Sequence, residues 1–224
     1  MRLETVISMK HELFASALIA ALLAVGASDA RAADRPKLVL VVVVDQFRYD
    51  YTTRFRDDYH AGLARMLDQG AIFTDARYIH FPTVTAVGHS TVSSGATPSV
   101  SGIIGNEWYD RTAAKSVTSV SDDDTKLVGG VPGTIGSSPR KLLVSTFADE
   151  LKMAGRGGKV IGISIKDRSA ILPVGHTADA AYWFDNDSGH WVTSDYYVRE
   201  LPKWVQQIND ARPTYKYLGG NGCR

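Results

Sequence analysis

Two uninterrupted runs of aliphatic, mostly β-branched residues constrain this chain most. One occupies Lys37–Val44 and the other Lys159–Ile165. Such continuous runs are typical of strands buried on both faces, as in parallel sheets. Because helical segments lie between the two runs, we predict an α/β fold: a mainly parallel sheet with helices on both faces, and with both runs as inner strands.

Shorter patterns predict the remaining elements. A segment at about 107–140 is rich in Asp, Gly and Pro, so we predict a loop-rich excursion there with at most a short hairpin. The other predicted elements are helices at Gly62–Asp68 and Leu142–Ala154, a largely helical Ser194–Asp210, and short strands at Ala71–Thr74, Ala178–Phe184 and Trp191–Thr193.

The first 32 residues have the composition of an export signal. A basic pair, Lys10-His11, precedes a short apolar run, and Ala30-Arg31-Ala32 follows it. This order is typical of a secretory signal peptide, and the run is short for a membrane span. We therefore predict a signal peptide at 1–32, a folded domain at 33–224 and a periplasmic or secreted protein; an uncleaved anchor helix is the alternative.

Charge and cysteine content exclude several classes of partner. The formal net charge is +1, so no basic excess points to a nucleic-acid polymer or to a membrane surface. The single cysteine cannot form an internal disulfide bond. We expect a small-molecule ligand, and no membrane association after signal cleavage.

The stretch Phe81–Gly95 is rich in hydroxyl groups and is the strongest candidate for a reactive site. Small residues follow Thr85, and Gly95 can end a helix. A hydroxyl in the first turn of a helix lies where unpaired N–H groups and the positive end of the helix dipole favour an anion. Thr85 is therefore a candidate nucleophile toward a phosphorus ester, although Ser and Thr also serve as simple helix caps.

Four more polar residues follow the ends of predicted elements. Asp45 follows the first aliphatic run, and Lys166 and Arg168 follow the second. Since alternate residues of a strand point to one side, Lys166 and Arg168 are expected to point together, with Asp167 pointing away. Two cations suit a phosphoryl group, and Asn106 can donate a neutral N–H. A threonine hydroxyl needs a base or a metal, so Asp45 is predicted to be a metal ligand.

Taken in order, these motifs resemble the alkaline phosphatase superfamily, in particular the branch of periplasmic phosphate-irrepressible alkaline phosphatases and type I phosphodiesterases/nucleotide pyrophosphatases. The resemblance runs from about Lys37 to about Leu218. It is carried by Val-Val-Asp45-Gln, Phe81-Pro-Thr-Val-Thr85-Ala-Val-Gly-His89, Gly102-Ile-Ile-Gly-Asn106-Glu-Trp-Tyr-Asp110 and Lys166-Asp-Arg168.

The resemblance implies a role for each of these five polar residues. Asp45 is implied to bind zinc, Thr85 to be the phosphorylated nucleophile at that metal, and Asn106 to contact a phosphate oxygen. Lys166 and Arg168 are implied to hold oxygens that a diester would esterify. The implied activity is metal-dependent phosphomonoester hydrolysis, as in alkaline phosphatases, through a phosphothreonine intermediate, with two Zn²⁺ ions and a small phosphate ester as substrate.

Part of the family pattern is missing from this chain. The family's further zinc ligands come from an Asp-x-x-x-His, an Asp-His pair and a distant His, and the first two motifs are absent. His176 and His190 do not fit these patterns, and His89 is expected to be a buried hydrogen-bonding side chain. The family's chains are also longer, and Gly220–Arg224 resembles nothing in them. We therefore expect the N-terminal part of a phosphatase, apparently truncated at the C-terminus, with impaired or no activity.

Three alternatives remain open at this point. A phosphodiesterase or nucleotide pyrophosphatase would share the nucleophile, and a non-catalytic remnant would share only the fold. A serine hydrolase is the third, because Gly88-His-Ser90-Thr-Val92 begins like a nucleophile elbow but lacks its second glycine.

Overall fold

The structure, a computed structural model, describes residues 36–155 and 158–213. The chain divides into two units, with the boundary between Val43 and Val44. The predicted signal peptide lies outside the described residues. Within those two ranges, none of the helices has the length and apolar character of a membrane span.

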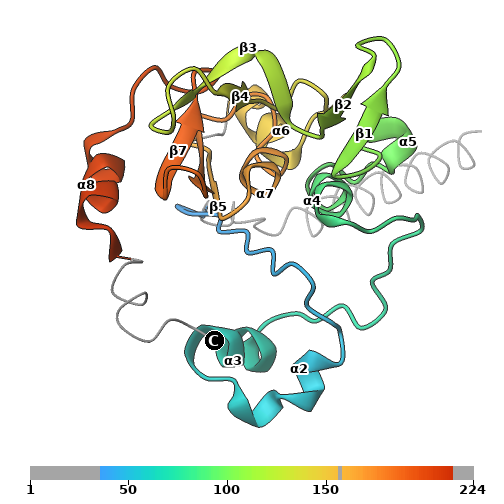
Figure 1. Cartoon of the computed structure of the whole chain (residues 1–224). Helices are drawn as coiled ribbons and strands as arrows, with labels where there is room; N and C mark the ends of the chain where they lie inside the picture. Colours follow the sequence, from blue (N-terminus) through green and yellow to red (C-terminus); the bar gives the residue numbers. More distant parts are fainter. Residues whose placement is uncertain (1–35, 156–157, 214–224) are drawn as a thin grey trace, which may run out of the picture. The chain divides into compact units, whose positions relative to one another are not determined.

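The second unit contains a mixed five-stranded sheet (Figure 1). β5 and β6 are parallel, and the other three pairings are antiparallel. The β3–β7 pairing spans two residue pairs, Leu127 with Ser194 and Val128 with Thr193. The order is β4-β3-β7-β6-β5, with β3 at Ser121–Val128, β4 at Ile135–Ser137, β5 at Ile161–Ser164, β6 at Ala180–Asp185 and β7 at His190–Ser194. The α/β class is confirmed, whereas the sheet is mixed rather than mainly parallel.

Within the described residues, the second unit contains eight helical elements. They are α2 (Tyr51–Arg54), the 3₁₀ helix η1 (Arg56–Asp58), α3 (Ala61–Gln69), α4 (Thr85–Ser94), α5 (Pro98–Ser101), α6 (Phe147–Met153), α7 (Asp167–Ile171) and α8 (Lys203–Ala211).

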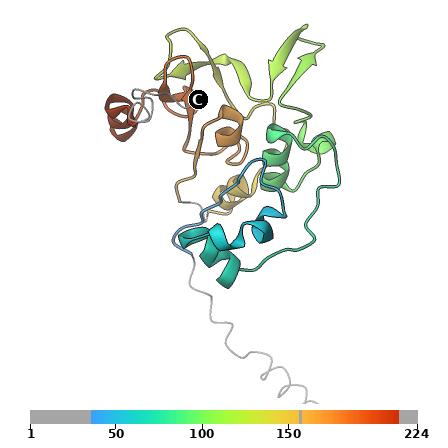
Figure 2. The ribbon, with the colours of Figure 1, turned by 60° about the horizontal axis from the view of Figure 1, so that its bottom comes forward.

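Helices lie on both faces of β6, as predicted: α4 and α7 contribute to the core on one face, and α8 packs on the other. Ala181 and Trp183 belong to the main core cluster together with buried residues of α4 and α7. The alternate residues Ala180 and Tyr182 belong to a second cluster with Val205 of α8. Figures 1 and 2 both show α4 beside α6 and α7.

The Lys37–Val44 run is not a strand, so this prediction was wrong. Its aliphatic side chains, Leu38 to Val44, are between 39% and 77% exposed. No strand pairing of this run occurs within the described residues. β-branched residues favour a strand, but a strand also needs a neighbour that pairs with its N–H and C=O groups.

The Lys159–Ile165 run does contain a strand, but that strand lies at the edge of the sheet. β5 pairs with β6 alone, and Ile161, Ile163 and Ile165 are 48%, 60% and 70% exposed. The prediction of an inner strand was therefore wrong for this run within the described residues. The composition correctly indicated a strand, but it did not indicate how many neighbours the strand has.

The segment at about 107–140 contains four strands, although it was predicted to be rich in loops. β1 (Glu107–Asp110) and β2 (Lys115–Thr118) form a separate antiparallel hairpin, and β3 and β4 follow. These strands bury few apolar side chains, which explains the weak hydrophobic pattern. The acidic triplet Asp122–Asp124 lies inside β3, where Asp122 is paired with Arg140 and Asp123 with Lys115.

Helix predictions are confirmed best where a stop signal is present. α4 ends with Gly95 as its C-cap residue, as expected, and α3 ends in the same way with Gly70 as its C-cap residue. Two predicted helices begin later than expected: α6 begins after Thr146, and α8 begins after Pro202. The predicted strand at 71–74 is absent from the described structure.

A buried carboxylate fixes the start of α6. Thr146 and Asp149 form a capping box, in which each side chain accepts a hydrogen bond from the other residue's backbone N–H. Asp149 is 2% exposed, and it also accepts bonds from the N–H and the hydroxyl of Thr177, both at 2.8 Å. Burial alone would raise the pKa of Asp149, but the hydrogen bonds from Thr146 and Thr177 outweigh it and lower the pKa.

We expect Asp149→Asn to lower the free energy of unfolding by about 2 kcal/mol near pH 7, because charged acceptors of buried N–H groups are lost. A carboxyl with a lowered folded-state pKa stabilises the fold above its unfolded pKa, about 3.9, and this contribution disappears as the pH falls through the folded value. The difference between wild type and variant should therefore shrink below about pH 4 in urea titrations. Asp75→Asn, at an exposed ion pair with Arg77, is the control. A difference that stays constant from pH 7 to pH 2 would contradict this account.

Candidate functional site

The first turn of α4 presents Thr85 at the start of a helix. Val84 is extended and precedes the helix as its N-cap residue, and Thr85 is the first helical residue. At the other end, Gly95 has φ 71°, a conformation that favours glycine, and its N–H donates to Thr91 at 2.8 Å. Thr85 is 9% exposed, so its hydroxyl is held in a defined environment.

Asp45 lies directly beside the candidate nucleophile. The Thr85 hydroxyl donates a hydrogen bond to Oδ2 of Asp45 at 2.9 Å, across forty positions of sequence. Nζ of Lys166 lies 3.9 Å from the same oxygen. The structure therefore brings together three of the five predicted residues, with one hydroxyl, one carboxylate and one ammonium group in contact.

Asn106 approaches the same turn from the start of β1. Its Oδ1 accepts a hydrogen bond from the backbone N–H of Ala86 at 2.9 Å. Its backbone carbonyl accepts from the N–H of Ser119 at 2.9 Å, so the residue is held from two sides. Asn106 thus contacts the residue that follows Thr85 in the helix.

Lys166 and Arg168 do not lie on one strand. β5 ends at Ser164, Lys166 is the N-cap residue of α7, and Arg168 lies inside α7. The argument from strand alternation was therefore wrong, since the backbone changes from strand to helix between the two residues. Nη1 of Arg168 lies 3.7 Å from Asp167, which was expected to point away. Because α7 packs against α4, Arg168 remains on an element that borders the Thr85 helix.

Sequence reasoning missed the groups that hold these residues. Asp167 contacts Arg168, and the Ser137 hydroxyl donates to Asp167 at 3.3 Å. The N–H of Ala86 orients Asn106. No local pattern could have indicated these contacts, because two of them join residues that are far apart in sequence, and the third depends on where a strand ends.

The histidine and serine that follow Thr85 have structural partners. His89 is 5% exposed, and its Nδ1 donates to the carbonyl oxygen of Thr85 at 2.7 Å, as expected for a buried hydrogen-bonding side chain. Ser90 is fully buried, and its hydroxyl donates to the carbonyl oxygen of Val87 at 3.0 Å. A nucleophile elbow exposes its serine at a strand-to-helix turn. The serine hydrolase alternative is therefore rejected.

The described residues do not by themselves form a zinc site. Asp45 and Thr85 provide two adjacent oxygen atoms, whereas catalytic zinc normally has about three protein ligands. Residues 36–155 and 158–213 contain no group of three His, Cys, Asp or Glu side chains that could hold a metal. Of the histidines considered from the sequence, His89 bonds to the α4 backbone and His190 begins β7.

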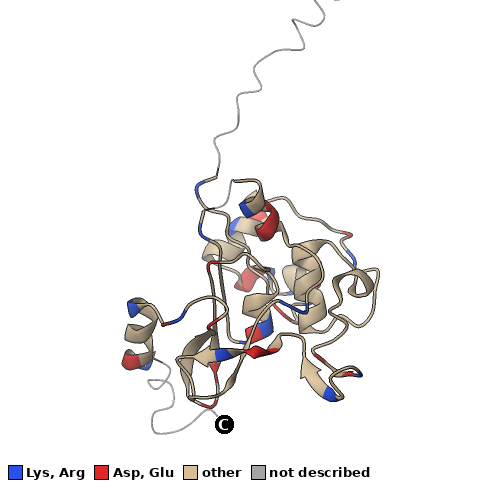
Figure 3. Ribbon diagram, turned by 90° about the horizontal axis from the view of Figure 1, so that it is seen from above, with Lys and Arg blue, Asp and Glu red and all other residues tan. Residues whose placement is uncertain are grey.

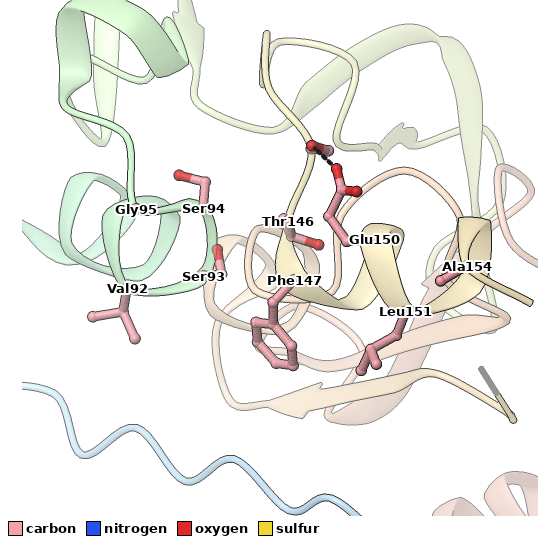
Figure 4. A pocket seen from close by; sticks show the side chains of 10 residues that line it. Val92, Ser93, Ser94, Gly95, Thr146, Phe147, Glu150, Leu151 and Ala154 are labelled. Carbon is pink, nitrogen blue, oxygen red and sulfur yellow. Dashed lines mark hydrogen bonds between the residues drawn. The ribbon is translucent and has the colours of Figure 1, made fainter. Parts of the chain in front are cut away.

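A pocket of about 830 Å³ lies at the opposite end of α4 from Thr85 (Figure 4). Phe147 and Leu151 line it from α6, and Val92 and Ser94 line it from α4. The Ser145 hydroxyl donates to Glu150 at 2.5 Å at its margin. This pocket includes none of the five predicted site residues.

In the view of Figure 3, neither basic nor acidic residues gather on one side of the described part of the chain. Basic and acidic segments are interspersed along the described ribbon. This agrees with a formal net charge of +1. The local pairing of Lys166 with Asp45 therefore matters more for this site than any long-range field.

Comparison with known proteins identifies similar sequences. The sequence profile of the family described as "Type I phosphodiesterase / nucleotide pyrophosphatase" matches residues 39–218. The chain is 44% identical over 188 residues to alkaline phosphatase PafA of Elizabethkingia meningoseptica, covering 83% of this chain and 34% of that protein. It is 44% identical over 186 residues to alkaline phosphatase PhoV of Synechococcus elongatus, covering 82% of this chain and 34% of that protein.

Solved structures show the same fold. The crystal structure of wild-type alkaline phosphatase PafA matches with a TM-score of 0.76 at 41% identity, covering 81% of this chain and 35% of that chain. A PafA mutant with four substitutions matches with a TM-score of 0.75 at 40% identity, covering 80% of this chain and 36% of that chain. The chain thus spans about a third of the length of the relatives it matches.

Proposed function

Because this chain belongs to the type I phosphodiesterase/nucleotide pyrophosphatase family, we propose that it carries the nucleophile part of a phosphomonoester hydrolase. Thr85 is the residue that takes the phosphoryl group. The observation that carries the proposal is the hydrogen bond from the Thr85 hydroxyl to Asp45, at the first turn of a helix and beside Lys166. The relatives named alkaline phosphatases support this choice of reaction.

The chemistry is a displacement at phosphorus. Oγ1 of Thr85 passes its proton to the carboxylate of Asp45 and forms a bond to phosphorus, while the bond from phosphorus to the ester oxygen breaks and the departing alkoxide takes up a proton to leave as the alcohol. Water then attacks the phosphothreonine, which restores the hydroxyl and releases phosphate. Asp45 accepts the hydrogen bond of the hydroxyl and so increases its nucleophilicity. Cations and N–H groups near phosphorus stabilise the negative charge on the transferred group.

The cations favour a monoester as the substrate. A monoester carries one more unesterified oxygen than a diester, and Lys166 and Arg168 supply a point charge and a planar fork for such oxygens. The PafA mutant supports these assignments, because it replaces a Thr, an Asn, a Lys and an Arg in the same chain order as Thr85, Asn106, Lys166 and Arg168. A small phosphate ester in the periplasm or outside the cell fits the predicted export signal at 1–32.

Asp45 and Thr85 are candidate ligands, but they provide two of the roughly three protein ligands that catalytic zinc requires. Losing one hydrogen-bond donor to the charge that develops in the transition state costs about 3–4 kcal/mol, which is a factor of about 10²–10³ in rate. Losing a metal ion from the same place should cost at least as much. We therefore expect this chain to bind phosphate and to turn over slowly or not at all.

Inorganic phosphate binding and Thr85 labelling test the proposal. In calorimetric titrations, Arg168→Ala and Lys166→Ala should each weaken phosphate binding about tenfold, because a charge-assisted hydrogen bond contributes about 1.5–3 kcal/mol. After incubation with p-nitrophenyl phosphate and zinc, mass spectrometry should find phosphate on Thr85. Turnover of this substrate, however slow, should disappear in Thr85→Ala.

Arg77→Ala is the matched control, since it removes one positive charge from an exposed ion pair. Equal phosphate affinity in wild type, Lys166→Ala and Arg168→Ala would overturn the assignment of the cations. Turnover that survives Thr85→Ala would overturn the nucleophile. Faster reaction with bis-p-nitrophenyl phosphate than with the monoester would favour the phosphodiesterase alternative, and no binding at all would favour a non-catalytic remnant.

A further inference from the structure

The residue that precedes α4 does not cap the helix with its side chain. The N-cap residue is Val84, whose side chain cannot accept a hydrogen bond, and no side-chain cap occurs there. The first N–H groups of any helix lack partners inside the helix, and a capping acceptor typically contributes about 1 kcal/mol. This helix positions Thr85, so the group that satisfies its first turn also affects the reactive hydroxyl.

Asn106 supplies the missing cap from twenty positions further along the chain. Its Oδ1 accepts from the N–H of Ala86 at 2.9 Å. Since a backbone N–H can only donate, the atom that faces it must be the amide oxygen, and Nδ2 lies on the other side of the amide group. Within the part of the chain that the structure describes, Nδ2 makes no hydrogen bond, which leaves a donor free beside the helix terminus.

The backbone of Asn106 is held independently of α4. Its carbonyl oxygen accepts from the N–H of Ser119, which follows β2 and is fully buried. The β1–β2 hairpin therefore fixes one side of Asn106 and α4 fixes the other. A rotation of the side chain would break the bond to Ala86, so the amide has one favoured orientation.

We infer that Asn106 is a positioning residue for Thr85: its side-chain oxygen caps α4, holds the first turn that carries Thr85, and so orients the amide nitrogen that the family resemblance assigns to a phosphate oxygen. The inference rests on the proposed function for the anion, but the cap itself does not depend on it. Hydrogen bonds in a chain polarise one another, so the N–H of Ala86 strengthens Nδ2 as a donor. One residue thus has two separable roles.

Two substitutions separate the roles. Asn106→Asp keeps an oxygen for the N–H of Ala86, and a carboxylate is a good cap at a helix N-terminus, but it removes the donor. Asn106→Ala removes both. Asn209→Ala is the matched control, because Asn209 is also a side-chain amide that accepts from a backbone N–H, that of Trp191 at 2.8 Å, at a place remote in sequence from α4.

The experiment measures hydrogen exchange at the Ala86 amide by NMR and, in parallel, inorganic phosphate binding. We expect protection of Ala86 to fall about tenfold in Asn106→Ala, which corresponds to the loss of one cap, and to persist in Asn106→Asp and Asn209→Ala. Phosphate affinity should fall in both Asn106 variants. Recovery of protection without recovery of affinity in Asn106→Asp is a result that a purely structural role would not produce.

Equal protection of Ala86 in wild type and Asn106→Ala would overturn the cap, and wild-type phosphate affinity in Asn106→Asp would overturn the donor role. If wild type fails to bind phosphate, the proposed function and the donor role fail together. In that case the exchange data still decide whether Asn106 caps α4.

Discussion

Replacing Gly162 with alanine is expected to lower the free energy of unfolding by about 3 kcal/mol, at the upper end of overpacking costs. A Cβ atom at this position of β5 would overlap the carbonyl oxygen of Ala170 in α7, and it would lie 3.1 Å from Cγ1 of Val174. The first of these atoms belongs to the backbone of α7 and the second to a buried side chain, so neither can move aside alone and α7 itself must shift. Because α7 carries Arg168, the substitution should also weaken phosphate binding.

Gly158→Ala is the control for this prediction. It lies shortly before β5, and a Cβ atom there would meet nothing within 4 Å. Urea unfolding followed by tryptophan fluorescence would compare the two variants with wild type. Equal midpoints for Gly162→Ala and Gly158→Ala would contradict the close approach of α7 to β5.

Self-association of the chain through the aliphatic run Leu38–Val44 is the second large effect that we expect. Seven consecutive aliphatic side chains are exposed there, without a charge among them. Exposed uncharged runs with strong strand preference pair readily with other chains. Burying one such side chain contributes about 1.5–3 kcal/mol. Val39→Lys combined with Val41→Lys should therefore shift the chain from oligomers toward monomer by more than tenfold in concentration.

Sedimentation velocity over a range of protein concentrations would measure this shift. Val131→Lys serves as the control, because Val131 is also exposed but lies outside the run. If the double variant associates as strongly as wild type, the association does not depend on this run. If Val131→Lys dissolves the oligomers equally well, net charge rather than the run controls association.

The helix that carries Thr85 could be predicted because its signals are local. A proline-led entry, small residues and a glycine that can adopt positive φ all lie within one stretch, and the structure has α4 with Gly95 at φ 71°. The proximity of Asp45 to Thr85 followed from a general rule about strand ends, even though the run before Asp45 is not a strand. The expectation for His89 was also local, since it bonds one turn back to Thr85.

The other features of the fold and the site depend on contacts between segments that are far apart in the sequence, or on where an element ends, and no single segment indicates these. Whether β5 lies inside a sheet or at its edge depends on the number of neighbouring strands, and residue composition does not contain that number. Lys166 and Arg168 were placed by strand alternation, which failed because the helix begins between them. The cap that Asn106 provides to α4 joins two distant segments and leaves no trace in either one.

The narrow β3–β7 pairing has a consequence for how the sheet assembles. β3 pairs with β4, and β6 pairs with β7, through strands that follow one another along the chain. Such pairings close small loops and lose little chain entropy, whereas joining β3 to β7 closes a loop that contains α6 and α7. Leu127 and Val128 make that junction with two residue pairs, and the N–H of Lys126 donates a further hydrogen bond to the carboxylate of Asp195 at 2.8 Å. The topology thus favours two locally formed halves that dock late through a short junction.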